Sequence, residues 1–295
     1  MAILTVENVS KSYGKINALK GVSFSVPKGS VFGILGPNGS GKTTLLGIIM
    51  NVLKASSGSF KLFDEAATDD HRKKIGTLLE TPNFYHYLSA VKNLKISAAI
   101  KGRGEDDIEN VLHTVDLYKR KDSAFSTFSL GMKQRLAIGA ALLGNPDVLV
   151  FDEPTNGLDP VGIAEIRTLI KNLSAKGKTI IMASHLLDEV EKVCTHVAIL
   201  KQGNLLASGT VREVFEENDI VQLAAADKQK LRAALAGLNN YARLDEVGGQ
   251  VELSYKSGTA DLEAINQFCF NNGIVLSHLQ LKKSNFESKF LALTN

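Results

Sequence analysis

The sequence predicts an α/β fold with a mainly parallel core sheet, followed by a smaller α+β unit. Continuously apolar runs of four or five residues recur through the first two thirds of the chain, as is typical of strands buried on both faces. Helical patterns lie between these runs, and strands that alternate with helices indicate a parallel sheet. Near residue 218 the order changes to strand–helix–strand–strand–helix–strand, which predicts a separate unit.

The first domain, expected over residues 1–218, begins with an antiparallel β subdomain. Its first 27 residues alternate apolar and polar positions on either side of Gly14, which predicts two strands joined by a turn. The apolar runs predict core strands at Val31–Leu35, Asp147–Phe151, Thr179–Met182 and Val197–Leu200. Helical periodicity predicts helices at Thr43–Val52, Lys133–Leu143, Gly162–Lys176 and Leu186–Val193. The stretch from about residue 82 to residue 130 contains no strand-like run, which predicts an inserted helical subdomain.

The second domain, expected over residues 219–295, has the element order of a ferredoxin-like fold. The predicted strands are Ile220–Ala225, Ala242–Val247, Gln250–Tyr255 and Ile274–Leu281. The predicted helices are Asp227–Leu238, Asp261–Asn271 and a short amphipathic segment at Phe286–Leu293. Gly248 and Gly249 separate two of the strands, and a Gly-Gly pair favours a two-residue hairpin turn. Acidic and basic residues are equally numerous here, so the domain is not a basic arm.

Composition narrows the possible functions. The 295 residues include 34 Lys+Arg and 31 Asp+Glu, and this net charge of +3 excludes a protein whose main task is to coat nucleic acid. The two cysteines, Cys194 and Cys269, lack metal-ligand spacing, which predicts buried thiols in a reducing compartment. No apolar stretch approaches the roughly 18–20 residues of a membrane span, and the N-terminus does not resemble a signal peptide. We therefore expect a cytoplasmic protein that reaches a membrane only through a partner.

A phosphate-binding loop is the most specific motif in the chain. Residues 36–43 match the pattern GxxxxGK[ST] and lie between a predicted buried strand and a predicted helix. Glycines allow successive backbone N–H groups to turn toward phosphate oxygens, and the helix N-terminus adds its positive dipole end. Lys42 can reach the β and γ phosphates, and the Thr43 hydroxyl can bind Mg²⁺. The expected nucleotide-binding residues of this loop are Gly36, Pro37, Asn38, Gly39, Ser40, Gly41, Lys42, Thr43 and Thr44.

Two carboxylates follow a second buried strand. Asp152 at the strand end suits a Mg²⁺ site, and Glu153 can accept a proton from an attacking water. Upstream, Ser129 is a suitable N-cap for a helix, and Gly131 allows a ligand to approach the backbone of that helix closely. The order of these motifs along the chain is more informative than any one of them.

Together these motifs resemble those of the nucleotide-binding subunit of an ATP-binding cassette (ABC) transporter, over about residues 2–215. The segment FSLGM, with Ser129 and Gly131, resembles the family signature LSGGQ. The segment NGLDP, with Asp159, resembles the D-loop, and Ser184-His185 resembles the switch-histidine motif. Tyr13 matches the aromatic residue that stacks on adenine.

The chain departs from the family pattern at several positions. Leu130 and Met132 replace Gly and Gln in the signature, which leaves the backbone donors in place. Glu80 stands where the family usually has Gln, and its oxygens remain able to bind Mg²⁺ or water. This residue and the segments SLGMKQR and EPTNGLDP are similar to the bacitracin-resistance and lantibiotic-immunity branch and to ABC-2-type exporters. Residues 285–293 resemble the end of exporter-type subunits.

The resemblance implies how such a chain works. Two chains pair head to tail, each ATP lies between Lys42 of one and Ser129 and Gly131 of the other, and His185 contacts the γ-phosphate. The partner ATPase can be an identical or a different chain. Separately encoded permease subunits receive the motion, and residues 84–87 lie where the family binds a coupling helix. The leading interpretation is therefore the ATPase of an exporter at the inner face of the cell membrane. The exported substrate, whether antimicrobial peptide, lipid or polysaccharide, stays open.

Three other functions agree less well with the sequence. An importer subunit is disfavoured by the C-terminal domain, Glu80 and the exporter-like end. A non-transport ABC ATPase acting on DNA ends is disfavoured because the chain has no sustained heptads between its phosphate loop and its signature. One acting on ribosomes is disfavoured because the chain has a single cassette. No nucleic-acid partner is therefore expected. A pure binding module is disfavoured because the whole catalytic set is present.

Overall fold

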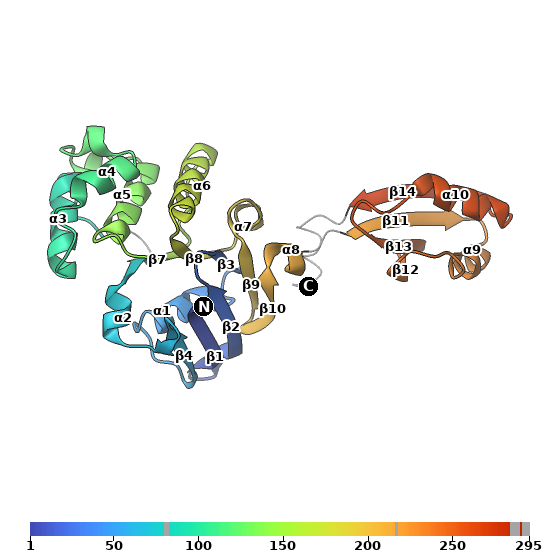
Figure 1. Ribbon diagram of the computed structural model, residues 1–295, viewed down its shortest axis with the longest axis horizontal. Helices are drawn as coiled ribbons and strands as arrows, with labels where there is room; N and C mark the ends of the chain where they lie inside the picture. The colour runs from blue at the N-terminus through green and yellow to red at the C-terminus, as the bar shows by residue number, and fades with distance from the viewer. Residues whose placement is uncertain (80–82, 216–217, 284–289, 291–295) are drawn as a thin grey trace. The chain divides into compact units, whose positions relative to one another are not determined.

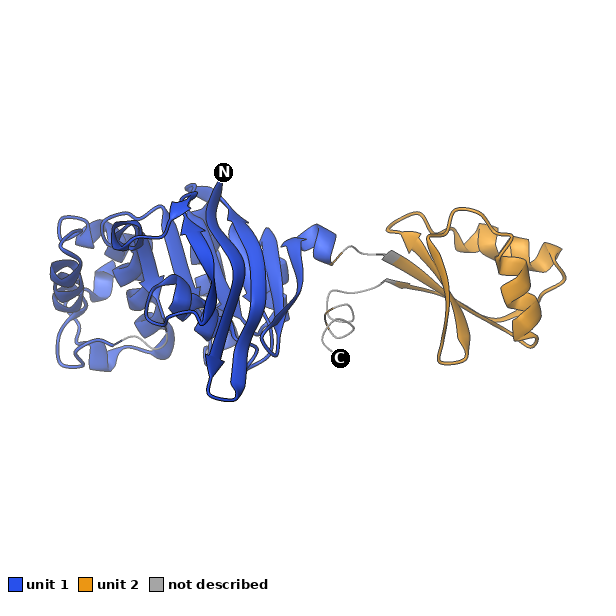
Figure 2. Ribbon diagram, turned by 90° about the horizontal axis from the view of Figure 1, so that it is seen from below, with its two compact units in different colours: residues 1–214 blue, residues 215–295 orange. Residues whose placement is uncertain are grey.

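The computed structural model describes residues 1–79, 83–215, 218–283 and 290. The chain divides into two compact units, Met1–Val214 and Phe215–Asn295, which are coloured separately in Figure 2. This division falls after Val214, whereas the sequence analysis places the boundary after residue 218.

A six-stranded sheet forms the core of the first unit, with strands in the order β10-β9-β3-β8-β7-β6 (Figure 1). The bounds are β3 Val31–Leu35, β6 Ile75–Leu78, β7 Val148–Asp152, β8 Thr179–Ser184, β9 His196–Lys201 and β10 Asn204–Thr210. All neighbours pair in parallel except β10, which is antiparallel to β9. Every residue of β3, β7 and β8 is buried, which is why these strands read as continuous apolar runs. The predicted mainly parallel core is confirmed.

An antiparallel sheet in the order β2-β1-β4-β5 packs beside this core. Its strands are β1 Ala2–Tyr13, β2 Ile16–Pro27, β4 Ser57–Leu62 and β5 Glu65–Ala66. Helix α1, Lys42–Ile49, contributes Leu45 and Leu46 to the same buried cluster as Val22 of β2 and Val150 of β7. One continuous core therefore anchors the helix that follows the phosphate loop.

Helices make up the remaining regular structure of the first unit. Their bounds are α2 Asp69–Lys73, α3 Ala90–Lys101, α4 Ile108–Thr114, α5 Leu130–Leu142, α6 Pro160–Ala175, α7 Leu187–Val193 and α8 Val211–Val214. Between residues 83 and 129 the structure describes α3, α4, short 3-10 turns and one isolated bridge, Ser89–Ala124, so the predicted helical subdomain is confirmed. None of the described helices is long and apolar enough to cross a membrane.

The second unit is a four-stranded antiparallel sheet in the order β12-β13-β11-β14. Its elements are β11 Asn218–Ala225, α9 Lys228–Leu235, β12 Arg243–Val247, β13 Gln250–Lys256, α10 Leu262–Asn271 and β14 Leu276–Lys283. Leu223 and Leu253 of the sheet share a buried core with Leu231 and Ile265 of the helices. The predicted α+β order is confirmed, and the expected amphipathic segment at Phe286–Leu293 lies outside the described residues except for Phe290.

The Gly248-Gly249 turn has the conformation expected of a tight hairpin. Both glycines have positive φ, 56° and 87°, and Val247 pairs directly with Gln250. Two positive φ angles are required by a type I′ turn, and glycine adopts them without steric cost.

Gly33 of β3 leaves room for a buried thiol. A Cβ added at Gly33 would lie 2.9 Å from Cys194 Sγ and 3.3 Å from both γ-methyl carbons of Val190. We expect Gly33→Ala to lower the free energy of unfolding by about 1–3 kcal/mol, because the added methyl group would overpack the core. Urea titration measures this change. The double variant Gly33→Ala/Cys194→Ala should lose less stability than the sum of the two single variants. Strictly additive losses would contradict this contact.

Both cysteines are buried and free, as the sequence predicts. Burial raises the pKa of each thiol above its ordinary value. Since the thiolate is the reactive form, burial disfavours reaction of both side chains in the folded protein.

Candidate nucleotide-binding site

Three loops meet at one edge of the core sheet. Strands β3, β8 and β7 are neighbours and run in parallel, so their carboxyl ends lie at the same edge. The phosphate loop follows β3, Glu153 follows β7, and His185 follows β8. The sheet topology therefore brings the phosphate loop together with two motifs that lie more than a hundred residues further along the sequence.

The phosphate loop is shaped by close backbone approaches. A Cβ at Gly36 would lie 2.2 Å from the Leu200 carbonyl oxygen, and one at Gly41 would lie 2.6 Å from the Ala18 carbonyl oxygen. Gly41 also has a φ of 109°, which side-chain-bearing residues rarely adopt. Between them, residues 37–39 are exposed to solvent, and α1 starts directly after Gly41. The loop therefore presents exposed backbone at a helix N-terminus, where anions bind.

Lys42 lies beneath this loop and is 6% exposed. Its Nζ donates to the carbonyl oxygens of Gly36 at 2.7 Å and Pro37 at 3.2 Å. The same ammonium forms an ion pair with Glu153 Oε1 at 3.3 Å. The carbonyl contacts hold the positive charge at the loop.

Glu153 links Lys42 to His185. Its Oε2 lies 2.8 Å from His185 Nδ1 and accepts from the His185 backbone N–H at 3.3 Å. Its own backbone N–H donates to the Ala183 carbonyl at 3.1 Å. Glu153 has a φ of 49°, a left-handed conformation that costs a non-glycine residue about 1–3 kcal/mol. Such strain is typical of functional positions, and here it aims the carboxylate between an ammonium and an imidazole.

Two oxygen donors near the loop fit a magnesium ion. Asp152 ends β7 and is 6% exposed, and Thr43 is exposed in the first turn of α1. Mg²⁺ in nucleotide sites is usually held by one or two carboxylates together with substrate phosphates and water. Consistent with that pattern, the described residues contain no group of three or more His, Cys, Asp or Glu that could hold a metal alone. Glu80, the third expected ligand, lies outside the described residues.

The signature segment opens α5. Ser129 is the N-cap, as predicted, and its hydroxyl accepts from the Met132 N–H at 3.3 Å. A Cβ at Gly131 would meet nothing closer than the Gly162 Cα at 4.0 Å. Within the described part of the chain, no hydrogen bond joins Ser129 or Gly131 to the phosphate loop.

Tyr13 and Asp159 make local contacts. Tyr13 ends β1, is 44% exposed and has Lys11 Nζ 4.9 Å from its ring centroid. The Asp159 carboxylate caps α6 and accepts from the Gly162 N–H at 2.9 Å. The described contacts join Lys42, Glu153 and His185 to one another, and none of those described joins Tyr13 or Asp159 to these three residues.

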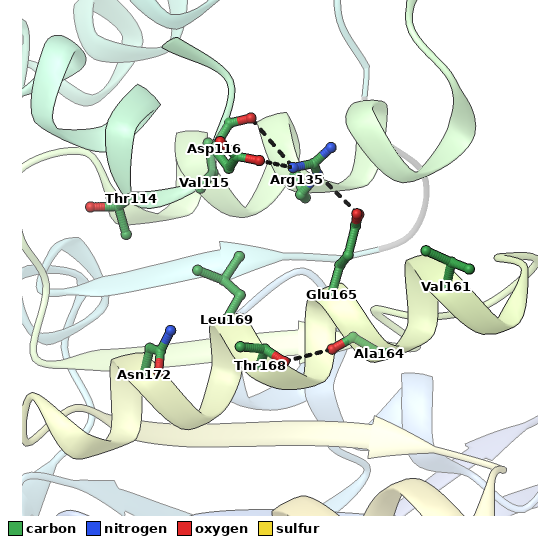
Figure 3. A pocket seen from close by; sticks show the side chains of 10 residues that line it. All are labelled: Thr114, Val115, Asp116, Arg135, Val161, Ala164, Glu165, Thr168, Leu169 and Asn172. Atoms are coloured by element: carbon green, nitrogen blue, oxygen red, sulfur yellow. Dashed lines mark hydrogen bonds and ion pairs between the residues drawn. The ribbon is translucent and has the colours of Figure 1, made fainter. Parts of the chain in front are cut away.

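A hollow of about 390 Å³ lies between α4, α5 and α6, away from the phosphate loop (Figure 3). Arg135 of α5 lines this hollow and forms two ion pairs. Its Nη1 lies 3.2 Å from Oδ2 of Asp116, which follows α4, and its Nε lies 3.6 Å from Oε2 of Glu165, which is on α6. These ion pairs connect the helical subdomain to the helix that follows the D-loop segment.

The sequence analysis did not single out Glu189, which is 3% exposed behind His185. Its neighbours in sequence, Asp188 and Glu191, are ordinary surface acids, so composition gives no signal. Helical spacing does give one, because Glu189 lies between Leu186 and Val193 on the stripe that faces the core.

Comparisons with known proteins decide the family. The family model described as "ABC transporter" matches residues 19–156. Over 99% of its length the chain is 32% identical to the bacitracin transport ATP-binding protein BcrA of Enterococcus faecalis, and the match covers 96% of that protein. The chain belongs to the ABC transporter ATP-binding family. Another member, the lantibiotic transport ATP-binding protein SrtF of Streptococcus pyogenes, is 38% identical over 69% of the chain and 89% of its own length.

Solved structures agree with this assignment. The dimeric structure of a post-hydrolysis state of the ATP-binding cassette MJ0796, bound to ADP and Pi, matches with a TM-score of 0.62 and 28% identity, over 70% of this chain and 98% of that one. The chain is thus an ATP-binding subunit of the ABC family and an ATPase with the ABC fold, as its motifs indicate.

Proposed function

We propose that the chain is the ATPase subunit of an exporter and hydrolyses ATP at Lys42, Glu153 and His185. The proposed ATPase mechanism rests on the position of the Glu153 carboxylate. A strained backbone holds it between the Lys42 ammonium and the His185 imidazole. A carboxylate in this position can act as a base toward a water, and the two cationic or proton-bearing neighbours can act on phosphate.

ATP binding would rearrange these contacts. The phosphates are stronger partners for Lys42 than one carboxylate, so they would draw the ammonium away and release Glu153 Oε1 for a water molecule. Glu153 would take the proton of that water as the water oxygen attacks the γ-phosphorus, and the bond from this phosphorus to the β–γ bridging oxygen would break, which leaves ADP and inorganic phosphate. His185 would donate to a γ-phosphate oxygen. Thr43 and Asp152 would hold Mg²⁺, which supplies charge neutralisation to the phosphates.

A second chain would complete each site. Ser129 is exposed, and Gly131 has open space above it, so a partner's nucleotide can approach both from outside. A head-to-tail pair places them on the ATP held by the other chain's Lys42, and a homodimer of this kind is isologous. The dimeric MJ0796 structure bound to ADP and Pi supports this arrangement.

The relatives suggest the class of substrate. BcrA and SrtF are named as transport ATP-binding proteins for bacitracin and for a lantibiotic, so we infer an antimicrobial peptide as the substrate. The direction, export, rests on the exporter-like sequence features given above. The chain would lie in the cytoplasm at the inner face of the membrane, bound to separately encoded permease subunits. Tyr85 and Tyr87, which are 51% and 76% exposed and have ring centroids 6.0 Å apart, offer an aromatic contact for such a subunit.

The permease assignment is tested by affinity purification of the tagged chain from native membranes in mild detergent, with partners identified by mass spectrometry. We expect a stoichiometric protein with several membrane spans. The Tyr85→Ala/Tyr87→Ala variant should lose it, whereas Ile100→Ala, which alters an apolar residue that is 82% exposed in the same subdomain, should retain it. Co-purification of ribosomes or DNA-repair proteins, without a membrane protein, would contradict the transporter role and leave the ATPase role intact.

A further inference from the structure

Glu189 closes a turn around His185. Its Oε2 lies 3.2 Å from Ser184 Oγ, on the residue directly before the histidine. That hydroxyl also accepts from the Leu186 N–H at 3.0 Å, directly after the histidine. The Ser184 carbonyl accepts from the Gly36 N–H at 3.4 Å, at the start of the phosphate loop. One buried hydroxyl thus fixes both flanks of His185, and Glu189 holds that hydroxyl.

The surroundings of Glu189 favour a neutral carboxyl. Within the described residues no ion pair reaches it, and its Oε1 has no hydrogen-bond partner. Burial raises the pKa of this carboxyl above its ordinary value, and the Glu153 carboxylate acts in the same direction. The hydroxyls of Thr155 and Ser184 and the guanidinium of Arg167 act in the opposite direction. An ionised carboxylate this deeply buried, with one firm donor and no paired cation, would be costly.

The other titratable groups around it do not change this balance. Arg167 of α6 is paired with Asp188 through Nη2 at 3.1 Å, while its buried Nε has no hydrogen-bond partner among the described residues; its charge faces Asp188 rather than forming an ion pair with Glu189. Cys194, which follows α7, is buried, and its raised pKa keeps the thiol neutral. Strand β3, which packs against α7, contains no titratable side chain.

We propose that Glu189 is a positioning residue that acts as a neutral carboxylic acid, and that through Ser184 it holds His185 against Glu153. This inference rests on the proposed catalytic function of that pair. The 3.2 Å contact lets Ser184 Oγ donate to a Glu189 oxygen, and it equally lets a neutral acid donate its O–H to Ser184 Oγ, whose own proton then faces the Leu186 carbonyl oxygen at 3.5 Å. In the proposed state the acid is the donor, and an amide N–H can replace it. A carboxylate cannot donate, and its charge would lie behind the Glu153–His185 contact.

Kinetics of two variants test the positioning role. Glu189→Gln keeps a neutral donor, and we expect its kcat for ATP hydrolysis at neutral pH to stay within about threefold of wild type. Glu189→Leu removes the donor, and we expect kcat to fall by about tenfold to a hundredfold with KM for ATP unchanged, since a small misplacement of catalytic groups has effects of that size. Glu191→Leu, on the exposed side of α7, is the matched control and should behave as wild type. Equal losses for Gln and Leu, or full activity of the folded Leu variant, would overturn the role.

Thermal unfolding of Glu189→Gln tests the protonation state independently of activity. Above the ordinary pKa of 4.5 a glutamic acid ionises in the unfolded chain, whereas the proposal keeps Glu189 neutral in the folded chain, in the direction in which burial shifts its pKa. The folded state then binds more protons than the unfolded state, so the stability of the wild-type protein falls as pH rises. Glu189→Gln has no ionisable group at this position, so it lacks this decrease. Between about pH 5 and pH 8 we expect the Tm of Glu189→Gln to rise progressively relative to wild type.

The two failures are distinguishable. A Tm difference that stays constant or falls with pH would overturn the neutral acid even if the protein is an active ATPase. A wild-type protein that hydrolyses no ATP would overturn the proposed function, while the Tm series would still report the state of Glu189.

Discussion

Glu153→Gln should bind ATP at least as tightly as the wild-type protein does and hydrolyse it about 10²–10⁴ times more slowly, because the amide cannot accept a proton from the attacking water. The substitution keeps the size of the side chain and one oxygen acceptor for the His185 contacts at 2.8 and 3.3 Å. Phosphate release, followed in excess Mg²⁺ and ATP, measures the loss. Glu191→Gln is the control, since that side chain is exposed on α7. Turnover by Glu153→Gln close to the wild-type rate would remove Glu153 as the base.

The same variant has a consequence for stability without nucleotide. Lys42 loses its one ion-pair partner in the described structure, while its side chain stays 5% exposed. An unpaired buried charge is destabilising, and bound phosphates compensate for it. ATP should therefore raise the Tm of Glu153→Gln by more than it raises the Tm of the wild-type protein, and equal increments would contradict the Lys42–Glu153 contact.

Lys42→Ala should weaken ATP binding by roughly tenfold to a hundredfold and abolish measurable hydrolysis. The estimate follows from losing one charge-assisted hydrogen bond, worth about 1.5–3 kcal/mol, with 1.4 kcal/mol per tenfold change in affinity. Calorimetric titration with ATP measures the binding, and Lys171→Ala, at an exposed position of α6, is the control. Unchanged affinity in Lys42→Ala would show that the phosphates bind elsewhere.

Much of the fold could be predicted from the sequence because its elements carry strong local signals. The core strands are buried on both faces and therefore read as unbroken apolar runs. The Gly248-Gly249 pair predicts a tight turn because glycine readily adopts positive φ angles. Ser129 predicts the start of α5 because its side chain can cap a helix N-terminus.

Other elements gave no such signal. Strand β4 is mostly exposed, β5 has two residues, and β6 has four, so none of them shows a clear alternation or a long apolar run. The sequence analysis therefore missed all three, together with the edge strand β10, whose pattern alternates between exposed and half-buried positions.

Some features of the candidate site could be predicted from the sequence and others could not. Each of Lys42, Glu153 and His185 could be predicted from its own motif, but their contacts depend on the strand order β3-β8-β7, which is a long-range property. Glu189 could not be separated from neighbouring surface acids by composition, because its role comes from burial behind His185.

The proposed function places each ATP between two chains, and no hydrogen bond among the described residues joins Ser129 or Gly131 to the phosphate loop of their own chain. The most direct test is the mass of Glu153→Gln in solution by light scattering after size exclusion, with and without Mg²⁺ and ATP. We expect the 31.8 kDa of one chain without nucleotide and about twice that mass with it. Adding Gly131→Glu, where a side chain meets nothing within 4 Å in its own chain, should leave ATP binding intact and keep the protein monomeric. A dimer unaffected by Gly131→Glu, or a monomer that hydrolyses ATP at the wild-type rate, would contradict the shared site.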